Sequence, residues 1–261
     1  MLVKAFILNF SNKLNRMKKI LFTAVIVFLG SQIGFAQSYL SDRPGIGNGS
    51  FITPKKMLGL ESGVQYSNTE MTDQFDIGQL LLRYGLSNSL EVRASLGSYS
   101  RLKTDLRRES STFDGFQDIG LGLKYNLISG NGLPTVSALA EVSLPVGSEY
   151  FTNEDTVPSV GLLADYSLTD QFAIASNIGY SFTTENVNDS WLFTITPGFS
   201  ITNTIGGFVG YAGNYFDGYE QHWVEGGFTV SLENGVQLDG NFGYDTENDI
   251  VFLGAGFAVG L

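Results

Sequence analysis

The sequence predicts an all-β chain that closes into a single antiparallel transmembrane β-barrel of twelve strands, with short periplasmic turns and longer extracellular loops. Short stretches such as residues 90–96 and 172–182 alternate apolar and polar side chains. A strand sends successive side chains to opposite faces, so each stretch has one apolar and one polar or small face. No segment after residue 36 has the length and apolarity of a membrane helix. These strands follow a secretion signal, as expected for an outer-membrane barrel.

Residues 17–36 have the pattern of a secretory signal peptide. Two lysines begin it, an apolar run follows, and the small residue Ala36 precedes the expected cleavage before Gln37. The apolar run is too short for a stable membrane span, which disfavours the alternative of an N-terminal anchor. Residues 1–16 then form an N-terminal extension, and Met17 is an alternative start.

After the signal, residues 37–55 are expected to form a periplasmic or lumen-entering N-terminal segment, with Arg43 reaching an inward-facing acid. Residues 56–261 are expected to form the barrel. The predicted strands are 56–67, 76–85, 89–98, 117–126, 134–145, 158–167, 171–182, 190–200, 204–214, 222–232, 235–244 and 250–261.

The connections between these strands alternate in length. Short connections contain Asn-Gly pairs or Asn, Asp and Ser, which favour tight turns. They are 86–88, 128–132, 168–170, 202–203 and 233–235. The longer connections are near 68–75, 99–116, 146–157, 183–189, 215–221 and 245–249. An even number of strands places every short turn, and both ends of the chain, in the periplasm.

Composition and charge exclude several classes of protein. The chain has 26 acids and 15 bases, and removal of residues 1–36 takes away five bases and no acids, which leaves a net charge of −16. A nucleic-acid partner is therefore not expected, because it would require a basic surface. The chain has no cysteine, which excludes disulfides, thiolate metal sites, cysteine nucleophiles and a lipoprotein anchor.

The strands of soluble β-sandwiches and lipocalin-like barrels also alternate apolar and polar side chains, but their apolar faces point inward. Here the less apolar face is rich in Gly, Ser, Thr and Asn, and bulky aromatic residues gather at the ends of strands. Such aromatic residues are typical of the membrane–water boundary. They are Tyr66, Tyr84, Tyr125, Tyr166, Phe182, Trp191, Phe199 and Tyr244.

The same alternation turns a set of charged side chains toward the lumen. Charges of both signs then share a narrow tube, where an unpaired charge is costly. They form either a selectivity ring or substrate path, or an ionic network that fills the lumen and stiffens the wall. Inward leucines such as Leu81, Leu139 and Leu163 would suit a poorly soluble substrate. The candidate lumen residues are Glu61, Arg83, Glu91, Arg93, Asp118, Lys124, Glu141, Asp165 and Asp239, to which parity adds Glu225.

No catalytic residue, metal site or cofactor is expected. His222 is the single histidine, and no serine with an orienting Asn or Asp matches it as the nucleophile of a hydrolase. The acidic runs near 149–155 and 245–249 could bind divalent cations, but their spacing matches no calcium loop. The loop 99–116 carries four bases and would either contact lipopolysaccharide phosphates or form ordinary surface. Those bases are Arg101, Lys103, Arg107 and Arg108.

Several motifs occur in a consistent order along the chain. They are Asp42-Arg43-Pro44-Gly45, Leu60-Glu61-x-Gly63, the run 83–93, the run 118–125, Ser143-Leu144-Pro145-Val146-Gly147, the run 177–180 and Gln237-Leu238-Asp239. Together they resemble the family called putative MetA-pathway of phenol degradation, with Val146 where the family commonly has Thr. The resemblance implies an outer-membrane barrel that passes aromatic or other hydrophobic compounds.

Residues 257–261 keep the alternation to the end and resemble the C-terminal signal that the barrel-insertion machinery reads, although Leu261 stands where Phe is usual. The expected function is a passive outer-membrane transporter for small, aromatic or hydrophobic compounds, without enzymatic activity. The expected partners are outer-membrane lipid, lipopolysaccharide, the insertion machinery and an unidentified small molecule. The alternative is a structural or adhesive barrel with a filled lumen, which acts through its outer loops.

Overall fold

The computed structural model describes residues 39–106, 109–130, 132–232 and 235–261. Contacts divide the chain into units 1–35 and 36–261, and everything below concerns the second unit. The expected signal peptide lies outside the described residues. So do Arg107, Arg108, Asn131 and the first two residues of the turn 233–235.

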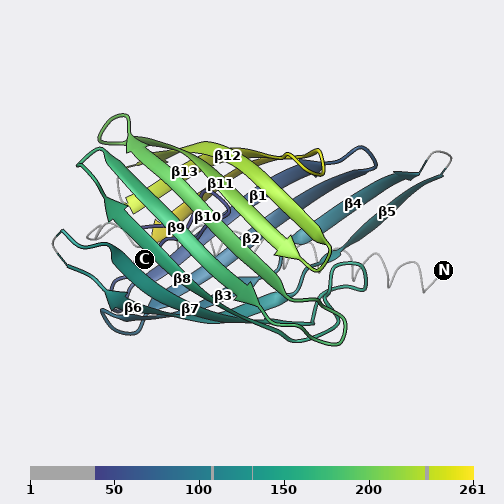
Figure 1. Ribbon diagram of the computed structural model, residues 1–261, viewed down its shortest axis with the longest axis horizontal. Coiled ribbons are helices and arrows are strands. Elements are labelled where there is room, and N and C mark those ends of the chain that lie inside the picture. Colours follow the sequence, from purple (N-terminus) through teal and green to yellow (C-terminus); the bar gives the residue numbers. More distant parts are fainter. Residues whose placement is uncertain (1–38, 107–108, 131, 233–234) are drawn as a thin grey trace, which may run out of the picture. The chain divides into compact units, whose positions relative to one another are not determined.

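Fourteen β-strands make up the described fold (Figure 1). Twelve of them form the wall of the barrel, and β4 and β5 form an additional hairpin. The strands are β1 (Leu58–Asn68), β2 (Thr72–Gly85), β3 (Leu90–Leu96), β4 (Tyr99–Leu106), β5 (Glu109–Phe116), β6 (Ile119–Ile128), β7 (Thr135–Leu144), β8 (Val157–Ser167), β9 (Phe172–Ser181), β10 (Ser190–Ser200), β11 (Ile205–Phe216), β12 (Tyr219–Ser231), β13 (Val236–Asp245) and β14 (Ile250–Gly260).

The barrel closes because β1 pairs with β2 on one side and with β14 on the other. Glu61, for example, is opposite Leu81 of β2 and Ala258 of β14. All the pairings between these strands are antiparallel. Most join strands that are consecutive in the chain, and the exceptions are β1 with β14, β2 with β4 and β3 with β6. A closed sheet leaves no unpaired edge in the membrane, where water cannot satisfy backbone groups. The predicted barrel of twelve strands is thus confirmed.

The segment 99–116 differs from the prediction, because it forms a β-hairpin and not an irregular loop. β3 pairs with β2 as far as Leu96 opposite Leu80, and β4 continues along β2 from Tyr99 opposite Ile77. Residues 78–79 and 97–98 lie unpaired between these two ladders. Charged side chains occupy alternate positions of β4, which concealed its strand pattern in the sequence.

Several outer connections are shorter than expected because the strands continue beyond the predicted boundaries. β1 and β2 are joined by residues 69–71, and β11 and β12 by residues 217–218. In the described part of the chain, the connections 145–156 and 182–189 remain long. Polar residues at these strand ends therefore take part in strand pairing.

The two faces of the wall differ in the predicted sense. Apolar side chains such as Leu123 and Leu253 are 51% and 58% exposed, whereas Arg83, Glu61 and Lys124 are 0% exposed. All eight aromatic residues predicted for the membrane boundary are exposed. Apolar groups outside and charged groups inside are the arrangement of a barrel that spans a lipid bilayer.

Within the described ranges, no helix is long and apolar enough to cross a membrane.

Candidate functional site

Residues 39–55, here called the inner segment, lie against the inward-facing side chains of the wall. The Tyr39 hydroxyl donates a hydrogen bond to Glu61 at 2.6 Å, and the Thr53 backbone N–H donates one to Glu91 at 2.8 Å. Between these points the segment is in close contact with the wall. A Cβ added at Gly47 would lie 2.9 Å from the Asn177 side chain and 3.0 Å from the Thr194 hydroxyl. The inner segment therefore occupies the lumen.

Asp42 is the charge centre of the inner segment. Its carboxylate lies 3.3 Å from Arg83, 3.0 Å from Arg93 and 3.1 Å from Lys124. Burial by itself would raise the pKa of the Asp42 carboxyl, but these three cations outweigh burial and hold that pKa well below its usual range. Asp42 therefore carries its negative charge wherever the three cations surround it.

Arg83 joins the inner segment to two acids of the wall. One terminal nitrogen lies 2.9 Å from Glu61, and the other donates to Glu91 at 3.0 Å. Arg83 also donates to the backbone carbonyl of Phe51 at 3.0 Å. A planar guanidinium with five donors suits a site with several partners, and Arg83, Glu61 and Glu91 are all fully buried.

Arg43 reaches an inward acid, because its guanidinium binds Asp239 through two nitrogens at 3.1 and 3.3 Å. A third nitrogen donates to the Gln79 side chain at 3.2 Å. Glycines of the wall make room for this side chain. A Cβ at Gly63 or Gly256 would lie 2.6 or 2.5 Å from the Arg43 guanidinium.

The opposite side of the inner segment faces acids that bind backbone groups. Asp165 accepts a hydrogen bond from the Ser50 N–H at 2.6 Å, and Glu225 accepts from the Ile46 N–H at 3.1 and 3.2 Å. Among the described residues, neither acid forms an ion pair. The charges of the lumen are thus unevenly distributed: the cations gather near β2, β3 and β6, and unpaired acids lie on β8 and β12.

Eight of the nine predicted lumen residues contact the inner segment or one another. Glu141 contributes through Arg93, at 3.2 Å. Asp118 differs, because its carboxylate accepts from the backbone N–H groups of Gly147 and Asn153 and so holds the outer loop 145–156. Sequence reasoning missed Asp42 itself, although the motif that begins with Asp42 was among the features that signalled the family.

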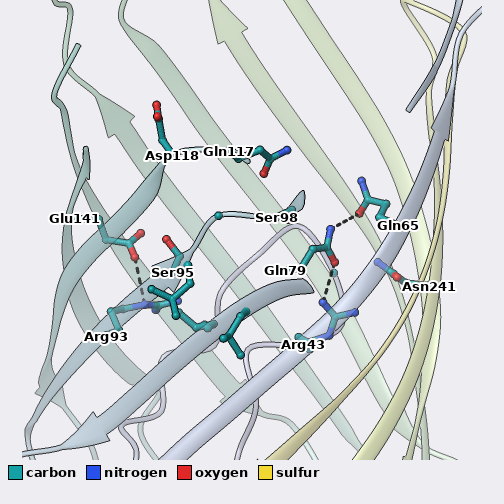
Figure 2. Close-up of a pocket in the computed structure, with 15 residues that line it drawn as sticks. Arg43, Gln65, Gln79, Arg93, Ser95, Ser98, Gln117, Asp118, Glu141 and Asn241 are labelled. Carbon is teal, nitrogen blue, oxygen red and sulfur yellow. Dashed lines mark hydrogen bonds and ion pairs between the residues drawn. The ribbon is translucent and has the colours of Figure 1, made fainter. Parts of the chain in front are cut away.

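A cavity of about 450 Å³, here called the Arg93 cavity, lies beside the inner segment (Figure 2). Figure 2 shows Arg93, Ser95 and Glu141 on one side and a chain of contacts from Arg43 through Gln79 to Gln65 on the other. Leu80 and Leu96, on the outer face of the wall, also line this cavity. The cavity therefore reaches the place where residues 78–79 and 97–98 interrupt the wall.

A second cavity of about 460 Å³, here called the Trp223 cavity, shares Gly45, Gln65 and Asn241 with the first. Residues of the outer β1–β2 turn also line it, so it lies toward the outer end of the barrel. Together, the two cavities provide space for a solute between the ion-paired inner segment and the outer end of the barrel.

His222 lies beside tyrosines and not beside a serine. Its Nδ1 is 2.6 Å from the Tyr211 hydroxyl, and its Nε2 is 3.6 Å from Glu220. Among the described residues, neither this hydrogen bond nor this ion pair of the His222 ring involves a serine. Two of the bases of the β4–β5 hairpin pair locally, Arg101 with Asp114 at 2.7 Å and Lys103 with Asp105 at 2.5 Å.

Solved structures with this fold include outer-membrane channels. The COG4313 outer membrane channel from Pseudomonas putida F1 is 13% identical, with a TM-score of 0.68 over 84% of this chain and 99% of that one. The NanC porin is 9% identical, with a TM-score of 0.55 over 77% and 98%. The KdgM porin in complex with disordered oligogalacturonate is 9% identical, with a TM-score of 0.52 over 76% and 98%. No curated protein sequence matches the chain.

The apolar outer face, the closed sheet and these likenesses make the chain an outer-membrane barrel. The sequence family described as "Putative MetA-pathway of phenol degradation" matches residues 41–261. This match spans the inner segment from Ser41 onward and every strand of the barrel. The chain belongs to that family.

Proposed function

We propose that the protein is a passive outer-membrane channel for small solutes, without enzymatic activity, in which the inner segment is the gate. The observation that carries this proposal is the arrangement of the lumen. Two cavities lie outward of a segment that fills the lumen and is held only by ion pairs and hydrogen bonds. A solute that enters from outside therefore reaches a binding space whose inner side is the inner segment itself.

The inner segment distinguishes this barrel from an open general porin. Asp42 binds Arg93 of β3 and Arg43 binds Asp239 of β13, so the segment is held between separate strands of the wall and obstructs the direct path. None of these bonds is covalent, so the segment can shift while its end at residue 55 stays joined to the barrel. Passage through the lumen then depends on this movement.

The charge distribution favours uncharged solutes. Arg43 and Arg93 line the Arg93 cavity, and both already bind acids. Leu80, Leu81 and Leu96 give the same cavity an apolar side. These features support the class that the family implies, which is aromatic or otherwise hydrophobic compounds.

The surroundings of the barrel follow from its surfaces. We assign the exposed apolar belt to outer-membrane lipid and the strand that ends at Gly260 to recognition by the barrel-insertion machinery. We also assign lipopolysaccharide as a partner of the β4–β5 hairpin, on the basis of bases such as Arg101 and Lys103. Export would use residues 17–36 as a cleaved signal.

A disulfide between the inner segment and the wall tests the gate. A Cβ at Gly47 would lie 3.0 Å from the Thr194 hydroxyl oxygen, so sulfur at position 194 would be within bonding reach of Gly47→Cys. The chain has no cysteine, so Gly47→Cys with Thr194→Cys creates a single pair. We expect the oxidised double variant to admit small solutes into liposomes more slowly than its reduced form.

The matched controls are the two single-cysteine variants, whose swelling rates should not respond to reductant. Equal rates for the oxidised and reduced double variant would reject the inner segment as the gate. No permeation by any small uncharged solute through the reduced protein would reject the channel itself.

A structural or adhesive barrel is the second candidate, because the buried ion pairs also suit a permanently filled lumen. Its action would then depend on outer elements such as the β4–β5 hairpin. Replacing residues 99–116 by a short turn would abolish the function, whereas the disulfide above would leave it unchanged. For the channel we expect the opposite pair of results.

A further inference from the structure

The Trp223 cavity contains no charged side chain, although the chain has 26 acids and 15 bases. Its lining consists of Asn, Gln, Ser and Thr side chains from β1, β2, the turn between them and β13, together with aromatic and aliphatic groups. Every other side of the lumen that we describe above contains ions. The Trp223 cavity is therefore built for a ligand without charge.

An aromatic surface forms one side of this cavity. The rings of Trp223 and Phe252 lie 5.3 Å apart at 48°. Gly243 makes room for the Phe252 ring, since a Cβ there would be 2.3 Å from it. Such a surface accepts the apolar face of a ring by stacking.

Hydrogen-bonding groups face the same space. Among the described residues, the side chains of Asn241 and Ser67 and the indole N–H of Trp223 have no hydrogen-bond partner. Gln65 makes one long contact, with Gln79 at 3.5 Å. Gly254 leaves room for the Asn241 side chain, since a Cβ there would lie 2.3 Å from the Asn241 side-chain oxygen. The cavity thus offers both hydrogen-bond donors and hydrogen-bond acceptors to a ligand.

We propose that the Trp223 cavity is a binding site for an uncharged ring that carries several hydroxyl groups, the chemistry of a neutral sugar. The ring face stacks on Trp223 and Phe252, and the hydroxyls exchange hydrogen bonds with Asn241, Gln65 and Ser67. This proposal rests on the proposed channel function, and it adds a second class of uncharged solute, held in the Trp223 cavity, to the aromatic or hydrophobic class that the Arg93 cavity supports.

The composition of the lining separates this class from its rivals. A hydrocarbon would cover amide and hydroxyl groups without replacing their hydrogen bonds to water, at a cost of about 1–3 kcal/mol for each group. An ionic solute would find no opposite charge in the lining. A phenol has a ring face but only one hydroxyl, which would satisfy one of the free groups.

The two tryptophans give a direct measurement. Trp191 lies on the outer wall and is 51% exposed, and Trp223 lines the cavity. In the Trp191→Phe variant of the full barrel in detergent, all tryptophan fluorescence comes from Trp223. We expect a saturable fluorescence change with glucose or maltose. Asn241→Ala in that background should weaken binding about fivefold, the value of one hydrogen bond of about 1 kcal/mol.

The Trp223→Phe variant, which keeps Trp191, should show no change with the same sugars. Glucuronate, the same ring with a negative charge, should bind more weakly than glucose. The proposal is overturned if neutral sugars give no change, if glucuronate binds as tightly, or if phenol binds more tightly than the sugars. Liposome swelling is measured separately, so binding without permeation rejects the channel and permeation without binding rejects this site.

Discussion

The Nζ atom of Lys124 lies 3.1 Å from each carboxylate oxygen of Asp42, so one group of the wall holds the inner segment through both oxygens. Lys124 also donates to the Gly49 carbonyl at 2.7 Å, seven residues further along the segment. It therefore binds both the outgoing and the returning part of the segment. This relationship makes the inner segment a loop closed around a cation, and not a strap that crosses the lumen once.

Asp42→Asn should release the inner segment. The substitution removes the shared partner of Arg83, Arg93 and Lys124. The three cations then repel one another more strongly, and Lys124 is left without an ion-pair partner among the described residues. We expect larger or more frequent openings in planar bilayers than in the wild type. The control is Asp114→Asn. Asp114 is an exposed acid that pairs with Arg101 in the β4–β5 hairpin, so this substitution should leave the openings unchanged. Identical traces for Asp42→Asn and wild type would show that Asp42 does not hold the gate.

Arg93→Leu should reduce the stability of the barrel far more than Arg101→Leu. Arg93 is buried between Asp42 and Glu141. We expect its loss to cost about 3 kcal/mol, the lower end of the range for a broken buried ion pair, because Asp42 keeps Arg83 and Lys124. Arg101 is exposed, where such pairs contribute little. The midpoint of urea unfolding in detergent measures both variants. Equal midpoints would mean that the two faces of the wall have been assigned incorrectly.

These residues show what the sequence could and could not predict. A period of two along the strands was enough to place Glu61, Arg83 and Lys124 on the lumen face. The period tells which face of the wall a side chain is on, but not how far along the barrel axis it lies. It therefore did not reveal that Asp118 holds an outer loop instead of joining the ion pairs around Asp42. Asp42 lies in a segment without regular structure, so no periodicity could place it. Its role depends on three-dimensional neighbours that are 41 to 82 residues away.

The gate should stay closed in moderately acidic solution. The pKa of Asp42 is lowered in the folded protein, so its contribution to holding the segment is complete above the unfolded value of about 3.9. That contribution is lost only as the pH falls through the lower, folded pKa. Conductance that is constant from neutral pH to about pH 5, and rises only below about pH 4, is the expected profile. A rise between pH 7 and pH 5 would exclude Asp42 as the titrating group of the gate.

Any ions that pass the inner segment should be mostly cations. On the β8 and β12 side, Asp165 and Glu225 bind only backbone N–H groups, so their charges are not neutralised by a base among the described residues. A cation 4 Å from a single charge gains about 1 kcal/mol even in water, roughly a fivefold preference. The reversal potential in a potassium chloride gradient should therefore show cation selectivity. Asp165→Asn with Glu225→Gln keeps an oxygen acceptor at both positions and should remove most of that selectivity, whereas Asp114→Asn should not. Selectivity that survives the double substitution would place the ion path along another side of the inner segment.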